Sequence, residues 1–185
     1  RQQGIEVRFA DPGEPESFRA LSDDKTRAYF GETLPNLRLV PLPIEEVASI
    51  GRELGIPLIV DNTAAPITCR PFEFGATIVV HSLTKYIGGH GTSIGGVIID
   101  AGTFDWVANP KQQPHFNKPV CSYHGAIWGA LVPEARGATI AYALRAPVVL
   151  LRDLRSALSP ANAFNIIQGL ETLALRFNQH QKNES

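Results

Sequence analysis

The sequence predicts an α/β fold in three layers, with a mostly parallel sheet covered by helices on both faces. Two short apolar runs, at residues 58–60 and 78–80, consist of leucine, isoleucine and valine, as strands buried on both faces do. An amphipathic segment at residues 44–54 predicts a helix just before the first run. Strands that alternate with helices in this way are typical of a parallel sheet.

The N-terminal half contains further predicted elements. Residues 5–9 and 27–30 are each expected to form a strand, and residues 97–99 are expected to form another further along. Residues 11–24 are acidic, contain two prolines, and are expected to form a loop and a surface helix. The helix at 44–54 is expected to end at Gly55, a C-cap residue. Its inner side would carry Ile44, Val47, Ala48, Ile50 and Leu54.

The C-terminal half is expected to be helical after an irregular stretch. Residues 102–137 are rich in aromatic residues and prolines, which is consistent with either a wall beside an active site or an interface segment. Residues 139–154 predict a helix that Pro147 kinks or interrupts. Ser159 and Pro160 fit the N-cap and first position of another helix, with a break expected near Gly169.

The overall composition excludes several classes of function. Of the 185 residues, 44% are hydrophobic and 19% are charged, as in ordinary globular proteins. A formal net charge of -1 provides no electrostatic footprint for nucleic acid or an anionic membrane. No apolar run is long enough to span a bilayer. Cys69 and Cys121 are far apart, which favours reduced thiols and predicts a cytoplasmic protein.

The stretch at residues 77–96 carries the strongest chemical signal. Its strand is followed by Ser82, Thr84 and Lys85, and then by a glycine-rich segment. A lysine past the end of a buried strand is usually a solvated surface residue, but this is also where open α/β sheets bind ligands. Hydroxyls and glycine backbone amides can bind an anion. An amine beside an anion site is what a Schiff base with a phosphorylated aldehyde cofactor requires.

A second strand end strengthens this interpretation. The apolar run at residues 58–60 ends on Asp61, one strand–helix connection before Lys85. If the two strands are neighbours, both side chains emerge at the same edge of the sheet. An acid beside a pyridine nitrogen keeps that nitrogen protonated, and pyridoxal phosphate enzymes combine such an acid with a Schiff-base lysine.

The motifs VDNT at residues 60–63 and VVHSLTKYIGGHGTSIGGVIID at residues 79–100 resemble the Cys/Met-metabolism family of pyridoxal phosphate enzymes. The resemblance is greatest to the O-acetylhomoserine sulfhydrylase branch. It implies pyridoxal 5'-phosphate as cofactor, with Lys85 as the catalytic Schiff-base lysine and proton shuttle. It also implies that Asp61 pairs with the ring nitrogen, that Ser82 and Thr84 bind the phosphate, and that Asn36 lies near the phenolic oxygen or the substrate carboxylate.

The same resemblance implies the reaction. O-Acetyl-L-homoserine would undergo γ-replacement by sulfide or a small thiol, which gives homocysteine or a thioether amino acid, and acetate. A γ- or β-lyase or synthase of the same family is an alternative, and so is a non-catalytic fragment or partner chain. Beyond the small-molecule substrate, the resemblance implies a homo-oligomer, a tetramer in the family.

The resemblance also implies that the chain is a central piece of a longer protein of fold type I. Residues 1–172 would form the second half of the cofactor-binding large domain. Residues 173–185 would begin the linker helix into an absent C-terminal domain. A companion chain could then supply the missing parts of the site.

Three rival interpretations have less support. Ser82 and Lys85 fit the S-x-x-K of penicillin-binding proteins, but no S-D-N or K-T-G element accompanies them. The phosphate-loop pattern G-x-x-x-x-G-K-[ST] is absent, since the lysine precedes the glycines. The five histidines have no metal-ligand spacing, so no metal is expected, and His81 is expected to be a hydrogen-bonded core or supporting residue.

Overall fold

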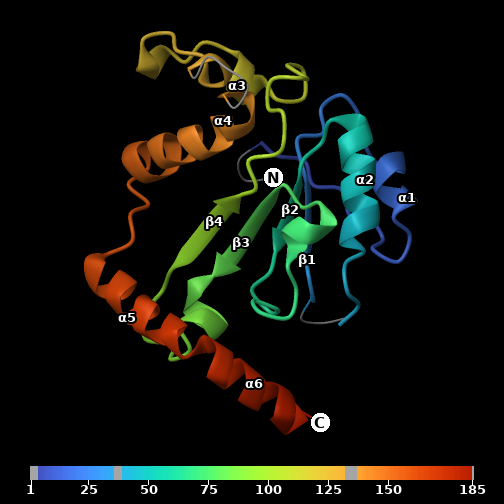
Figure 1. Ribbon diagram of the computed structural model, residues 1–185. Coiled ribbons are helices and arrows are strands. Elements are labelled where there is room, and N and C mark those ends of the chain that lie inside the picture. The colour runs from blue at the N-terminus through green and yellow to red at the C-terminus, as the bar shows by residue number, and fades with distance from the viewer. Residues whose placement is uncertain (1–3, 36–38, 132–136, 185) are drawn as a thin grey trace.

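The computed structural model describes residues 4–35, 39–131 and 137–184, and its centre is a four-stranded sheet (Figure 1). The strands lie in the order β1-β2-β3-β4. β1 (Tyr29–Glu32), β2 (Leu58–Asp61) and β3 (Ile78–Ser82) are parallel. β4 (Gly96–Asp100) runs antiparallel to β3, so the sheet is mostly parallel, as predicted.

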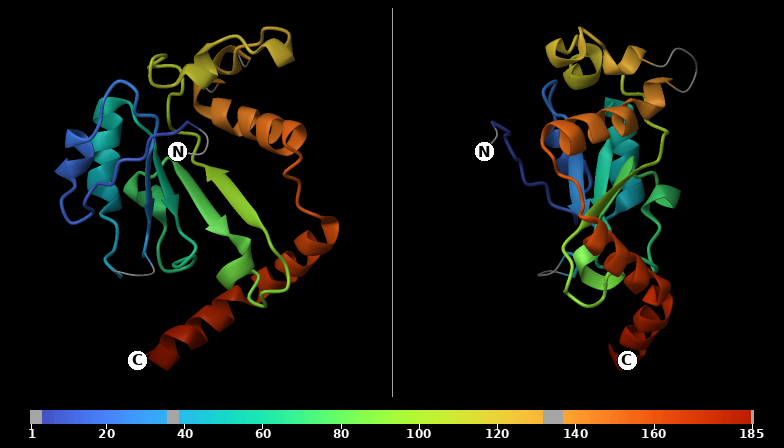
Figure 2. Two further views of the ribbon diagram at one scale, coloured as in Figure 1. Left: turned by 180° about the vertical axis from the view of Figure 1, so that it is seen from behind. Right: turned by 90° about the vertical axis from the view of Figure 1, so that its left-hand side faces the viewer.

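The helices lie around this sheet in separate groups (Figures 1 and 2). The α-helices are α1 (Glu16–Ala20), α2 (Ile44–Leu54), α3 (Pro114–Asn117), α4 (Gly137–Ala146), α5 (Pro160–Glu171) and α6 (Leu173–Glu184). Tight 3₁₀ turns occupy Pro71–Phe74, Cys121–Tyr123 and Trp128–Ala130. Two π-helical segments, Leu83–Ile87 and Pro147–Asp153, follow β3 and α4. Among the described helices, none is long and apolar enough to cross a bilayer.

Alternate side chains of the central strands enter two different cores. Leu58 and Val60 of β2 pack with α1 and α2 residues such as Val47. Ile78 of β3 packs on the opposite side with aromatic residues and with Ala141 of α4. Because strand side chains alternate between faces, the sheet is covered on both sides. The predicted three-layer arrangement is therefore confirmed.

Several local predictions are also confirmed. Gly55 follows α2 with φ 69°, the left-handed conformation expected of a C-cap. Pro147 ends α4 and begins the π-helical segment. Ser159 is the N-cap of α5, and its Oγ accepts a hydrogen bond from the Asn162 N–H at 3.2 Å.

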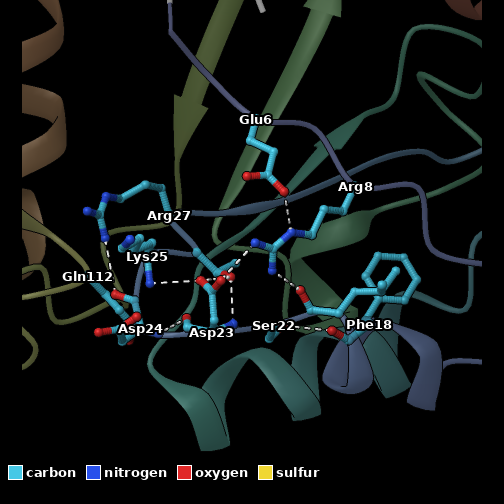
Figure 3. Close-up of polar contacts among 11 residues, drawn as sticks. Glu6, Arg8, Phe18, Ser22, Asp23, Asp24, Lys25, Arg27 and Gln112 are labelled. Carbon is cyan, nitrogen blue, oxygen red and sulfur yellow. Dashed lines mark hydrogen bonds and ion pairs between the residues drawn. The ribbon is translucent and has the colours of Figure 1, made fainter.

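The expected strand at residues 5–9 is wrong. The structure assigns no strand there, and Ile5, Val7 and Phe9 are exposed, Phe9 by 91%. An alternating sequence forms a strand only where a neighbouring strand offers hydrogen bonds, and β1 pairs with β2 alone in the described sheet. The segment is instead tied down by Arg8, which forms ion pairs with Glu6 and Asp23 at 2.7 and 2.8 Å (Figure 3).

The predicted break near Gly169 is also misplaced. α5 continues to Glu171, and Thr172 separates it from α6. Gly169 serves close packing instead, because a Cβ at this position would lie 2.2 Å from the Gly88 carbonyl oxygen. The glycine therefore lets α5 pack directly on the backbone that follows β3.

Candidate active site

The carboxyl ends of β2 and β3 bring the predicted site residues to one edge of the sheet. In the parallel register Asp61 lies opposite Val80, two residues before Ser82. Residues two apart on a strand share a face, so Asp61 and Ser82 project from the same side of the sheet. Lys85 follows three positions later. The prediction that the two strands are neighbours is therefore confirmed.

Thr63 connects the two strand ends. Its backbone N–H donates to Asp61 Oδ1 at 2.9 Å, and its Oγ1 accepts a hydrogen bond from the Ser82 N–H at 2.7 Å. Thr63 therefore fixes both the Asp61 carboxylate and the backbone at Ser82, directly before the segment Leu83–Ile87 that carries Lys85. The sequence analysis assigned Thr63 no role, although its place in the VDNT motif, directly after Asp61 and Asn62, could have suggested one.

Asn62 stabilises the same edge of the sheet through hydrogen bonds to neighbouring segments. It is 2% exposed, its N–H donates to the Val80 carbonyl oxygen at 3.0 Å, and its Oδ1 accepts from Thr33 Oγ1 at 2.8 Å. A buried amide with its hydrogen bonds satisfied holds neighbouring segments in one arrangement. Asn62 therefore supports the backbone on which Asp61 and Thr63 are carried.

Lys85 reaches the surface of a cavity at this edge. It lies in the π-helical segment Leu83–Ile87 and departs from helical geometry, with φ −88° and ψ −125°. The cavity has a volume of about 610 Å³, within the range of about 300–1,000 Å³ usual for small-molecule sites. Its lining consists of Glu32, Leu34, Asp61, Thr63, Ala64, Ser82, Lys85, Tyr86, Gly89, Gly91, Arg176 and His180.

Two other predicted site residues are placed differently. The Thr84 hydroxyl donates to the Gly95 carbonyl oxygen at 3.3 Å and accepts from the Gly95 N–H at 3.0 Å. Thr84 is not among the residues that line the cavity, so its hydroxyl braces the glycine-rich loop. Asn36 lies outside the described residues.

His81 lies on the opposite face of β3 from Ser82. Its Nδ1 is buried and has no hydrogen-bond partner among the described residues. Burial lowers the pKa of His81 below its ordinary value, against the opposing effect of the Asp61 charge. A neutral imidazole is therefore favoured, although an interaction with the Asn62 backbone also opposes the shift in pKa.

Within the described ranges, no three His, Cys, Asp or Glu residues lie close enough together to hold a metal ion. The groups that do converge are an amine, a carboxylate, a hydroxyl and glycine backbone at the carboxyl ends of parallel strands. This set fits a phosphorylated pyridine aldehyde, since each of its reactive groups meets a complementary residue. The fold and cavity thus define a class of α/β protein with a small-molecule site at the carboxyl ends of parallel strands, lined by a lysine and a carboxylate.

The chain belongs to the family of Cys/Met metabolism PLP-dependent enzymes, whose family model matches residues 1–185. It is 50% identical to the O-acetyl-L-homoserine sulfhydrylase of Leptospira meyeri, over 97% of this chain and 41% of that protein. It is 42% identical to the homocysteine/cysteine synthase of Saccharomyces cerevisiae, over 97% of this chain and 40% of that one. The chain therefore spans about two fifths of the length of these relatives.

Solved structures resemble this fold closely. An O-acetylhomoserine (thiol)-lyase from Campylobacter jejuni superposes with a TM-score of 0.87 at 36% identity, over 97% of this chain and 44% of that one. That structure carries a pyridoxyl-lysine phosphate. The O-acetylhomoserine sulfhydrylase of Wolinella succinogenes gives a TM-score of 0.70 at 33% identity, over 93% and 45% of the two chains.

Proposed function

We propose that this chain forms the cofactor-binding part of an O-acetylhomoserine sulfhydrylase. O-Acetyl-L-homoserine and sulfide would give homocysteine and acetate, and a small thiol would give a thioether amino acid and acetate. The observation that carries the proposal is that Lys85, Asp61 and Ser82 all line the same cavity. The relatives named as O-acetylhomoserine sulfhydrylase and homocysteine synthase support this choice of substrate within the family.

Each residue has a defined task in this proposal. Bound pyridoxal phosphate supplies an electron sink that stabilises negative charge at the substrate α-carbon. Lys85 would hold the cofactor, and its Nζ would accept the α-proton of the substrate. The Asp61 carboxylate keeps a proton on the pyridine nitrogen, and Thr63 fixes the orientation of that carboxylate.

The phosphate would lie among hydroxyls and backbone amides at the end of β3. Ser82 lines the cavity and donates its O–H to the phosphate. The family resemblance also assigns Thr84 to the phosphate, and to reach it the Thr84 side chain would have to leave Gly95, with which its hydroxyl forms two hydrogen bonds in the structure. Asn36 would contact the phenolic oxygen of the cofactor or the substrate carboxylate.

The wider organisation is part of the same proposal. Residues 1–172 would belong to the cofactor-binding domain, and residues 173–185 would start the linker helix into a C-terminal domain. α6 begins at Leu173, which is consistent with that division. A cytoplasmic homotetramer would be the working form, as the family resemblance implies.

Replacing Lys85 tests the proposal directly. Lys85→Ala removes the amine that holds the cofactor, so borohydride reduction should no longer fix pyridoxal phosphate to the protein. The exposed Lys111→Ala serves as the matched control and should retain fixed cofactor. Mass spectrometry of the reduced peptide identifies the modified residue. Fixation on a lysine other than Lys85 would contradict the assignment.

Substrate competition tests the choice of reaction. One relative is named a homocysteine/cysteine synthase, so O-acetyl-L-serine is the competitor to compare. We expect the cofactor-loaded protein to release acetate from O-acetyl-L-homoserine with the higher kcat/KM when sulfide is present. Release of α-keto acid in place of a sulfur-containing product would identify a lyase instead.

A further inference from the structure

Arg176, on the second turn of α6, makes an unusual set of contacts beside the cavity. Its Nη1 donates to the Tyr86 carbonyl oxygen at 2.8 Å, and its Nη2 donates to the Ile87 and Gly169 carbonyl oxygens at 3.1 and 2.7 Å. Its Nε donates to Thr172 Oγ1 at 3.1 Å. These bonds use nearly all the donors of the guanidinium, which leaves little capacity to bind a ligand.

Two of the accepting carbonyls belong to the residues that directly follow Lys85. Tyr86 and Ile87 end the π-helical segment Leu83–Ile87, where carbonyl groups lose their intrahelical partners. A planar guanidinium suits this task because its fixed N–H fork can serve several carbonyls at once. Arg176 therefore acts as a side-chain cap for the segment that carries Lys85.

The surrounding packing is built around this cap. Gly89 leaves room for the guanidinium, because a Cβ there would lie 2.4 Å from Arg176 Nη1. The Tyr86 ring makes edge-on contacts with Phe177 and His180 of α6, at centroid distances of 5.3 and 5.7 Å. α6 is thus fixed on the segment after Lys85 through both a polar contact and aromatic contacts.

We propose that Arg176 is a positioning residue for Lys85. It fixes the backbone after the lysine so that the amine stays in the cavity with Asp61 and Ser82, and it ties that position to the junction of α5 and α6. This inference rests on the proposed function only in taking Lys85 as the cofactor lysine. Arg176 lines the cavity, but its hydrogen bonds go to backbone carbonyls and to Thr172, so the proposed role acts through the backbone that carries Lys85.

Amide hydrogen exchange on the cofactor-free protein tests the proposal. The Gly88 and Gly89 N–H groups donate to the Leu83 and Lys85 carbonyl oxygens, both at 2.8 Å, so their protection reports on this segment. In Arg176→Met these two amides should exchange about tenfold faster, the order expected for losing a charge-assisted hydrogen bond. Amides of β2 and β3 should exchange as in the wild type.

Two further variants separate a local effect from a general one. Thr172→Val removes the Nε partner but keeps the bonds to Tyr86 and Ile87, so protection of Gly88 and Gly89 should stay close to wild type. Arg176→Lys retains a positive donor and should restore part of the protection. Unchanged exchange of Gly88 and Gly89 in Arg176→Met overturns the proposal. A general loss of protection that Arg176→Lys does not repair also overturns it.

The cofactor-loaded protein provides the second measurement. We expect pyridoxal phosphate to leave Arg176→Met about tenfold faster than the wild type, with Thr172→Val unchanged. If wild-type protein shows no covalent cofactor at Lys85, the proposed function fails. The exchange data on cofactor-free protein would still decide whether Arg176 holds the segment, so the two failures are distinguishable.

Discussion

At the scale of single residues, the Asp61 carboxylate is oriented by the backbone that directly follows its own strand. Asp61 lies at the end of β2, and its Oδ1 accepts the Thr63 N–H at 2.9 Å. Thr63 in turn accepts the Ser82 N–H, so one short chain of hydrogen bonds spans both strand ends. A change at Asp61 should therefore alter charge while the geometry is kept.

Asp61→Asn tests that charge. The amide keeps the shape and can still accept the Thr63 N–H, but it no longer holds a proton on the pyridine nitrogen. We expect turnover of O-acetyl-L-homoserine to fall by at least about 10²-fold, the scale for loss of a positioned charge. The exposed Asp24→Asn is the matched control and should keep wild-type turnover. A near-normal rate in Asp61→Asn would assign the carboxylate a structural role.

Asp100, at the end of β4, should make stability depend on pH. Its Oδ2 is buried and forms no hydrogen bond of good geometry in the described part of the chain, and burial raises the pKa of its carboxyl above the ordinary 3.8, against the opposing effect of the Gly102 and Ala143 backbone N–H groups. Between pH 3.8 and the folded pKa, the folded state therefore keeps a proton that the unfolded chain has lost. Ionisation then destabilises the fold progressively as pH rises above 3.8 through the folded pKa.

Replacing Asp100 by Asn should remove this cost, while Oδ1 still accepts the Gly102 N–H. The free energy of unfolding, measured in urea, should exceed that of the wild type near pH 7. The difference should shrink toward zero at pH values below about 3.8, where both states of the wild type are protonated. A less stable variant at pH 7, relative to Asp24→Asn as control, would contradict this account.

At the scale of elements, α5 packs closely against the backbone that follows Lys85. Gly169 is the point of contact, with its Cα facing the Gly88 backbone. Helix propensity and packing therefore make opposite predictions for an alanine at this position. Alanine gains about 1 kcal/mol over glycine within a helix, whereas overpacking against backbone costs about 1–3 kcal/mol.

We expect packing to outweigh propensity, so Gly169→Ala should lower the free energy of unfolding. The clash is with a carbonyl oxygen, which cannot rotate away as a side chain can. Gln168→Ala compared with Gln168→Gly, at the exposed neighbouring position, calibrates the propensity difference in the same helix. Stabilisation by Gly169→Ala would show that the two segments can separate at little cost.

At the scale of the whole molecule, many large apolar side chains are exposed on the described surface. Phe9, Ile94 and Leu175 are 91%, 77% and 74% exposed, and on α5 Phe164 and Ile167 are 61% and 59% exposed. Phe164 and Ile167 are three positions apart on α5 and so lie on one helix face, and contiguous exposed apolar surface of this kind is common where one protein contacts another. The expected homo-oligomer or companion chain would provide such contacts.

The 185-residue chain, expressed alone, should therefore self-associate. Light scattering should give a mass well above 20.1 kDa, and the double change Phe164→Ser with Ile167→Ser should reduce association. Gln168→Ser is the control on the same helix, since it removes no apolar side chain. A monodisperse and active 20.1 kDa monomer would contradict this prediction.

Much of the fold could be predicted from sequence because its signals are local. The apolar runs of β2 and β3, the amphipathic pattern of α2 and the cap at Gly55 depend on residues close together in the chain. The strand predicted at residues 5–9 was wrong because strand formation depends on residues far away in the chain. Its pattern is that of a strand, but a strand also needs a partner, and sequence periodicity does not contain one.

The site shows the same division. The motifs alone were enough to predict that Lys85, Asp61 and Ser82 lie together, because parallel strands end at a common edge, and the structure places all three in one cavity. The groups that support these residues became visible only once the packed elements were known. Thr63 forms a hydrogen bond from the end of one strand to the end of the next. Arg176 bonds carbonyl groups that lie about ninety positions away in the sequence. Such contacts depend on how elements pack, which no local pattern encodes.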